Sequence, residues 1–209
     1  MTIQEINALL NSNYASVEEF KTKADWEFIS GYQKLSEEFI REFKDLIDWD
    51  RISVSQKLSN EFIREFKDNV DWDKISKFQK LSEEFSKEFN LTIDSDNWLY
   101  KSTEDKKQAV IATGLYECYE DYFIAYKGIR SDRYSNFNFQ YQYLKDGIYE
   151  SHCDCTKNEN SFGLSAWTKE KANSYCNQLV VKVKVNYEDV GKLVHDYWKI
   201  RCFKIQILE

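Results

Sequence analysis

The segment His152-Cys153-Asp154-Cys155 is the most compact group of metal-ligand side chains in the chain. Thiolates and imidazole are ligands that zinc prefers, and a structural zinc site needs four of them in tetrahedral geometry. His152, Cys153 and Cys155 supply three at most. The fourth ligand would have to be Cys176, Cys202 or His195. The pattern permits a metal site, and it equally permits a hairpin end that carries free thiols.

Nucleophilic catalysis is a second chemistry open to these residues. A cysteine nucleophile needs a nearby base and a lowered pKa. His195 could serve as the base for Cys153 or Cys155. No nucleophile signature surrounds either cysteine, and the chain contains no phosphate-binding loop, dinucleotide fingerprint or zinc-protease motif. We therefore assign no catalytic residue and expect no cofactor.

Four aromatic side chains are the candidates for binding a partner. Tyr141, Tyr143, Tyr149 and Trp167 lie in the same part of the chain. Tyrosine and tryptophan are enriched at protein interfaces, so these residues could line an interface or a pocket. Aromatic residues on alternating strand positions are equally typical of a core.

The first half of the chain must be organised by a repeat. Residues 25–47, 48–70 and 71–93 align without gaps on the frame D-W-x-x-I-S-x-x-Q-K-L-S-x-E-F-x-x-E-F. A fixed period of this length is typical of stacked units that each bury an apolar face against the next one. Residues 1–24 look like a degenerate first unit. We predict a helical array over residues 1–98.

Each unit offers two sets of helix-capping residues. The aspartates that begin the units precede a Trp-x-x-Ile turn and could cap it, and serines precede a Leu/Phe stripe with glutamates following. The aspartates are Asp25, Asp48 and Asp71, and the serines are Ser36, Ser59 and Ser82. An alternative capping box pairs Ser30 with Gln33, and likewise Ser53 with Gln56 and Ser76 with Gln79. One long helix or two short helices per unit both remain open, and the doubled caps favour two.

Residues 99–209 predict an α+β domain with a mainly antiparallel sheet and two helices. Asp146-Gly147 is a strong hairpin signal between the alternating segment 137–144 and residues 148–151. The other expected elements are helices over 103–118 and 168–175 and strands over 121–129, 162–167, 179–185 and 199–208.

Composition limits the setting and the partners. The chain has 209 residues, a net charge of −7 and interspersed acids and bases, so we expect no general nucleic-acid binding. The five cysteines and the polar N-terminal segment favour a reducing cytoplasmic setting, in a bacterial host. No apolar stretch is long enough for a membrane helix.

The repeat frame resembles helical repeats in uncharacterised proteins of phages, mobile elements and giant viruses. The second half resembles a domain of unknown function from the same kinds of genomes. The residues that carry this second resemblance are Tyr126-Lys127-Gly128, residues 143–149, His152-Cys153, residues 163–167, Ala172 and residues 199–202. Small acidic phage proteins without catalytic motifs include inhibitors of host defence such as anti-CRISPR proteins. These resemblances imply a non-enzymatic protein that docks on a host or self protein and inhibits a defence nuclease.

The alternative is an enzyme similar to ADP-ribosyltransferases. The order Tyr126-Lys127-Gly128, then Gly163-Leu164-Ser165 with a helix after it, is similar to that fold. Lys127 stands where the family commonly has arginine or histidine, and the catalytic glutamate has no clear counterpart, since Glu209 is the last residue.

Overall fold

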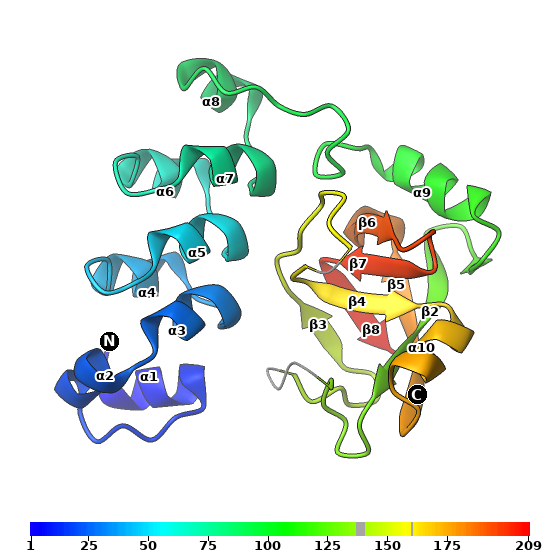
Figure 1. Cartoon of the computed structure of the whole chain (residues 1–209), viewed down its shortest axis with the longest axis horizontal. Coiled ribbons are helices and arrows are strands. Elements are labelled where there is room, and N and C mark those ends of the chain that lie inside the picture. The colour runs from blue at the N-terminus through cyan, green and yellow to red at the C-terminus, as the bar shows by residue number, and fades with distance from the viewer. Residues whose placement is uncertain (137–140, 160) are drawn as a thin grey trace. The chain divides into compact units, whose positions relative to one another are not determined.

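A computed structural model describes residues 1–136, 141–159 and 161–209. The chain forms two compact units, Met1–Thr92 and Ile93–Glu209. The first unit is all helical and the second is built around an antiparallel sheet, so the α+β class predicted from the sequence is confirmed (Figure 1). The division falls between Thr92 and Ile93, a few residues before the boundary expected near residue 98.

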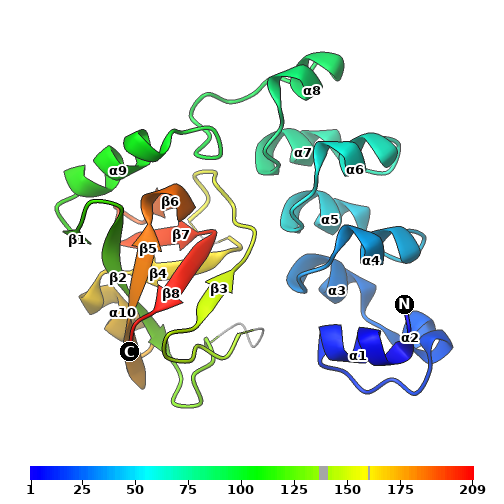
Figure 2. The same ribbon diagram turned by 180° about the vertical axis from the view of Figure 1, so that it is seen from behind.

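Each repeat of the first unit folds into two short helices. Trp and Ile of the frame lie on the first helix of a pair, and the second helix carries the phenylalanines. Figures 1 and 2 show the first helices stacked in chain order. The helices are α1 (Ile3–Leu10), α2 (Val17–Lys23), α3 (Trp26–Tyr32), α4 (Glu37–Glu42), α5 (Trp49–Ser55), α6 (Asn60–Glu65), α7 (Trp72–Phe78) and α8 (Glu83–Glu88).

The predicted aspartate and serine caps are confirmed. The Oδ1 atom of Asp25 accepts a hydrogen bond from the third backbone N–H of α3 at 2.9 Å, and Ser36 caps α4 through its Oγ at 3.1 Å. The same bonds recur at the start of the equivalent helices. Such caps satisfy N–H groups that a helix leaves free, which explains how helices of six or seven residues persist.

The alternative capping box at Ser30 and Gln33 is wrong, because Ser30 lies inside α3 and is buried. Its hydroxyl oxygen accepts a hydrogen bond from the backbone N–H of Asp48, the first residue of the next repeat, at 2.9 Å. Ser53 does the same for Asp71 at 3.0 Å. The frame serine therefore joins neighbouring repeats.

The frame glutamine also joins neighbouring repeats. Gln56 is 3% exposed, and its Oε1 accepts a hydrogen bond from the backbone N–H of Leu35 at 3.0 Å. Its Nε2 donates to the carbonyls of Ser30 and Gln33, both at 2.8 Å. Gln79 makes the same three bonds one repeat later, to Leu58, Ser53 and Gln56. Gln56 and Gln79 thus pair backbone groups that would otherwise be buried without a partner.

The array core is a continuous apolar seam. The frame Ile, Leu and Phe residues are buried in every repeat except Phe89, which is partly buried at the end of the array. The frame tryptophan packs on the second helix of its own repeat, with Trp49 and Phe66 ring centroids 4.9 Å apart. At the N-terminal end, Phe20 of α2 is fully buried and lies 5.3 Å from the ring of Phe43. Residues 1–24 therefore close the end of the array as a cap.

In the described part of the second unit, an eight-stranded antiparallel sheet is accompanied by two α-helices. The strand order is β3-β8-β5-β2-β4-β7-β6, and β1 pairs with β2. The chain passes from β7 to β8 through Phe203 alone, so one stretch of chain pairs with both β4 and β5. The elements are α9 (Thr103–Ala112), β1 (Glu117–Cys118), β2 (Tyr122–Ile129), β3 (Ile148–Glu150), β4 (Leu164–Trp167), α10 (Lys169–Tyr175), β5 (Leu179–Asn186), η1 (Tyr187–Asp189), β6 (Val190–Val194), β7 (Lys199–Cys202) and β8 (Lys204–Ile207).

The predicted hairpin around Asp146-Gly147 is wrong in its pairing. Residues 137–140 of the expected first strand lie outside the described residues. The turn itself is present, since the N–H of Gly147 bonds to the carbonyl of Leu144, but β3 pairs with β8, Ile148 opposite Gln206. Strand β6 was not expected, and helix α9 ends at Ala112, earlier than predicted.

The glycine at 128 lets α10 pack on the centre of the sheet. A Cβ at this position would lie 2.2 Å from the carbonyl oxygen of Ala172, a distance that no side chain tolerates. The helix follows β4 directly and covers β2. Among the described residues, none of the helices combines the length and the apolar character that a membrane span requires.

Candidate functional site

The candidate metal ligands lie in and beside the core of the second unit. Cys153 and Cys155 are buried, with their Sγ atoms 4.0 Å apart, and burial raises the pKa of the Cys153 thiol well above its ordinary value. The His152 ring lies beside the rings of Phe162 and Phe203. Within the described ranges, no three His, Cys, Asp or Glu side chains converge on a point where a metal ion could sit. The metal site remains a prediction without a third ligand at the thiol pair.

The residue between the two cysteines forms a buried ion pair. Asp154 and Arg201 are both fully buried, with 3.2 Å between Oδ2 and Nη1. Arg201 also donates to the carbonyl of Thr156 at 2.9 Å. Burial acts to raise the pKa of Asp154, but hydrogen bonds from Ser161 and Thr156 and the charge of Arg201 hold it below its ordinary value. The pair fixes the loop after β3 to strand β7.

The three candidate tyrosines form one cluster. The ring centroids of Tyr143 and Tyr149 are 4.9 Å apart, and Tyr141 lies 5.5 Å from Tyr149. Tyr143 is 2% exposed, whereas Tyr141 and Tyr149 are half-buried. The hydroxyl of Tyr149 donates to the carbonyl of Gln142 and accepts from the N–H of Leu144. This bonding ties the turn to β3, so the cluster has a clear structural role.

A buried lysine joins the tyrosine cluster to the fourth candidate aromatic. Lys127, in the centre of β2, is 3% exposed, and its Nζ lies 4.7 Å from the ring centroid of Tyr143 and 5.3 Å from that of Trp167. Its Nζ also donates to the carbonyl of Ser165 at 2.9 Å. Burial lowers the pKa of Lys127 to about 8, while the two ring faces and the carbonyl stabilise its charged form.

The two segments that resemble ADP-ribosyltransferases thus lie on paired strands. Tyr126 of β2 is opposite Trp167 of β4, and Lys127 bonds to Ser165. Because Lys127 is almost completely buried, its amine offers no surface to a dinucleotide.

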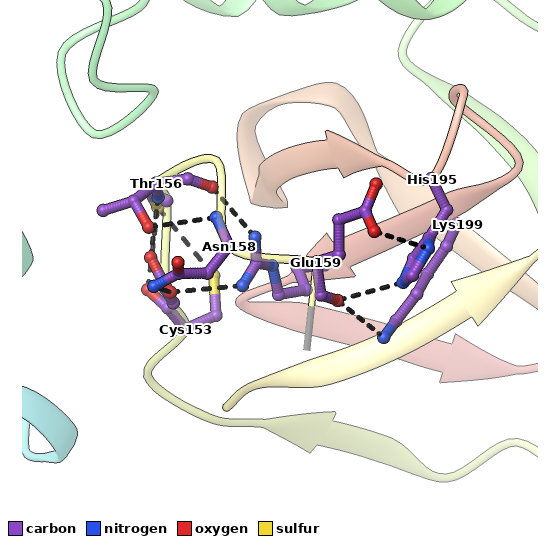
Figure 3. A network of polar contacts seen from close by, with 9 residues as sticks. Cys153, Thr156, Asn158, Glu159, His195 and Lys199 are labelled. Atoms are coloured by element: carbon purple, nitrogen blue, oxygen red, sulfur yellow. Dashed lines mark hydrogen bonds and ion pairs between the residues drawn. The ribbon is translucent and has the colours of Figure 1, made fainter. Parts of the chain in front are cut away.

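A polar network lies at the tip of the β6–β7 hairpin (Figure 3). The carbonyl of Glu159 is 3.1 Å from His195 Nε2 and accepts from Lys199 Nζ at 3.3 Å. The carboxylate of Glu159 lies 3.4 Å from His195 Nδ1. Three successive hairpin residues, His195, Asp196 and Tyr197, have left-handed backbone conformations. No cysteine takes part in these contacts, so the predicted pairing of His195 with Cys153 or Cys155 has no support among the described residues.

The surface of the array carries a second candidate site. The fourth and eighth positions of each repeat lie on the first helix, one turn apart on the same side. We call these six residues the first-helix face: Phe28, Tyr32, Arg51, Ser55, Lys74 and Phe78. Phe28 is 49% exposed and Tyr32 is 56% exposed, and their rings stack with centroids 5.2 Å apart. The isoleucine at the fifth position is buried in the core in every repeat, whereas the acidic residue at the third position is exposed.

Comparison with known proteins found no matching family model, no matching curated protein and no matching solved structure. The assignment of function therefore depends on the geometry of the chain itself.

Sequence reasoning noted Lys127 only through a resemblance and missed its burial, the ion pair of Arg201 and the first-helix face. Lys127 is the one charged residue of strand β2, and that exception to an apolar strand was the available signal; Arg201 shares the short strand β7 with Lys199, so its burial had no such signal. The first-helix face could be found by comparing the repeats at positions outside the frame.

Proposed function

We propose that this protein is a non-enzymatic binding protein whose first-helix face docks on another protein. The observation that carries this proposal is a difference between two kinds of position in the repeat. Frame positions are identical in all three repeats, and most make contacts that hold the array together. The two positions of the first-helix face point away from the core and differ in every repeat.

The structural role of the frame supports this separation. Asp and Ser cap helices, Gln and Ser join repeats, and the apolar residues fill the core. The fourth position carries Phe28, Arg51 and Lys74 in turn, three residues of different chemistry. An array that keeps its scaffold and varies its outward positions is organised as an extended binding surface.

The stacked pair of Phe28 and Tyr32 is the anchor of the proposed interface. Large side chains held in a fixed geometry bind at a low cost in conformational entropy, and aromatic residues are frequent among the few that dominate binding energy. The resemblance of the repeats favours a host protein as the partner, and in the first place a defence nuclease. The buried amine of Lys127 supports a binding protein over the alternative, an ADP-ribosyltransferase-type enzyme.

The test uses residues that the array already contains. The double variant Phe28→Arg with Tyr32→Ser gives the first repeat the residues of the second, so the fold is retained. The matched control replaces two exposed apolar residues of the other unit, Ile111→Arg with Leu115→Ser. Full-length proteins are used to capture partners from a lysate of the natural host, with circular dichroism as the check on folding.

We expect wild type and control to retain one stoichiometric partner and the face variant to bind it about 30-fold more weakly, as loss of a hot spot does. Recovery of no stoichiometric partner by the wild type, or full retention by the folded face variant, would overturn the proposal.

A further inference from the structure

The basic residues of the repeats are concentrated on one side of the first helices. Residues 25–93 contain sixteen acidic and eleven basic residues. Six of the eleven bases occupy three positions of the period, the fourth, seventh and tenth, and no acidic residue occupies these positions or the eighth. These bases are Lys34, Arg51, Lys57, Lys74, Lys77 and Lys80. An acidic array therefore carries a basic stripe that includes Arg51 and Lys74 of the first-helix face and continues beside that face.

The geometry of the array makes these positions contiguous. The fourth, seventh and eighth positions share one side of the first helix, and the tenth lies just beyond its end. Helix α5 packs between α3 and α7, so the sides line up from one repeat to the next (Figure 1). Neighbouring helix axes that pack in this way lie about 8–10 Å apart.

The lysines at the tenth position point to no ion-pair partner among the described residues. Lys34, Lys57 and Lys80, which we call the lysine row, are exposed, and their amines make no ion pair or hydrogen bond to any residue that the structure describes. Bases on the second helices differ in this respect. Arg41 pairs with Glu65 at 2.9 Å, and Arg64 pairs with Glu88 at 2.7 Å.

We infer that the first-helix face binds an acidic segment of the partner protein, with the lysine row contacting its carboxylates and the stacked Phe28 and Tyr32 contacting its apolar side chains. This inference rests on the proposed function. The lysine row repeats at roughly 8–10 Å, and carboxylates at every third residue of an extended segment are about 10 Å apart. Charge and spacing thus complement each other.

The charges beside the stripe favour a protein over a nucleic acid. The third position of every repeat is acidic, and Glu27 and Asp50 pair with Arg51 and Lys74 along the border of the stripe. A phosphate backbone would bring its continuous negative charge against this border, whereas a peptide can place its carboxylates away from it. The net charge of −7 acts in the same direction.

The test measures binding of a fluorescent peptide with the repeat Glu-Leu-Ser to the full chain by anisotropy. A Lys-Leu-Ser peptide and an oligothymidylate are the comparison probes. The row variant is Lys34→Gln, Lys57→Gln and Lys80→Gln. The matched control is Lys21→Gln, Lys44→Gln and Lys67→Gln, which removes the same charge at the same period from exposed lysines elsewhere on the array.

We expect the acidic peptide to bind the wild type and the control alike, the row variant to bind it about tenfold more weakly, and binding to weaken as salt rises. Equal losses in both variants, no binding of the acidic peptide, or tighter binding of the oligothymidylate would overturn the inference. If these results appear while the Phe28→Arg, Tyr32→Ser variant still loses its host partner, the proposed function stands and only the acidic segment is excluded.

Discussion

Replacement of Gln56 by alanine should destabilise the interface between the first and second repeats of the array. Gln56 is 3% exposed and bonds to the N–H of Leu35 and the carbonyls of Ser30 and Gln33. Alanine leaves these three backbone groups in an interface that remains closed by apolar contacts. The matched control is Gln33→Ala, the same residue at the same position of the first repeat.

The magnitude follows from the groups that lose their partner. An unsatisfied buried donor or acceptor costs about 1–3 kcal/mol. Local relaxation around the three groups lowers the sum, so we expect the free energy of unfolding to fall by about 3–6 kcal/mol. The side chain of Gln33 makes no hydrogen bond to the described residues, and Gln33 is only half-buried. Its replacement should cost less than about 1 kcal/mol.

The assay is urea unfolding of the full chain, followed by far-ultraviolet circular dichroism at the helical band. Most helices belong to Met1–Thr92, so this signal reports on the array. Gln79→Ala should reproduce the loss, because Gln79 makes the same bonds one repeat later. Equal effects of Gln56→Ala and Gln33→Ala would refute the idea that the glutamines hold the repeats together.

Three further predictions concern the second unit. Because the pKa of Lys127 is about 8 in the folded state and 10.5 in the unfolded state, the unfolded chain binds more protons between these values, and Lys127 should contribute a rise in stability of up to about 2 kcal/mol from pH 8 to 9.5. Buried Cys153 and Cys202, whose pKa values are raised, act in the opposite direction in any variant. Urea unfolding followed by tryptophan fluorescence should therefore show a change from pH 8 to 9.5 that is more favourable in the wild type than in Lys127→Met by about this amount. Asp154→Asn leaves the charge of Arg201 buried and unpaired, which should cost about 3–5 kcal/mol in the same assay; a loss below 1 kcal/mol would show that the pair is dispensable. Gly191→Ala would place a Cβ 2.2 Å from Cys153 Sγ and should cost about 1–3 kcal/mol, and a double-mutant cycle should show a smaller cost in a Cys153→Ala background.

Features set by local chemistry could be predicted from the sequence. The period placed the repeats, and Asp25 and Ser36 marked two helix starts because a cap depends on residues only three positions away. Ser30 and Gln33 matched a local capping pattern as well. Their actual contacts involve groups of the next repeat. No local rule distinguishes a capping box from contacts of this kind between repeats.

Pairing between distant segments was beyond local reasoning. Asp146-Gly147 forms its turn, but the partner of β3 is β8, far along the chain. The arrangement of the candidate site also depends on pairing between distant segments. Tyr143 and Trp167 were identified by residue type, whereas their meeting around Lys127 depends on the pairing of β2 with β4. The period predicts that the helices stack, but it does not show which side of each helix faces outward. The outward orientation of the first-helix face could therefore be established only in the structure.

Because Gln56 and Gln79 each bond to backbone groups of the repeat before them, the array can change length in whole units. Loss of residues 48–70 would bring Gln79 opposite Ser30, Gln33 and Leu35, the same chemical groups that Gln56 meets now. A gene with such near-identical tandem tracts can gain or lose a tract by recombination, and the product would fold without any compensating substitution. A lineage carrying this protein could thereby lengthen, shorten or reorder its outward surface in a single genetic event.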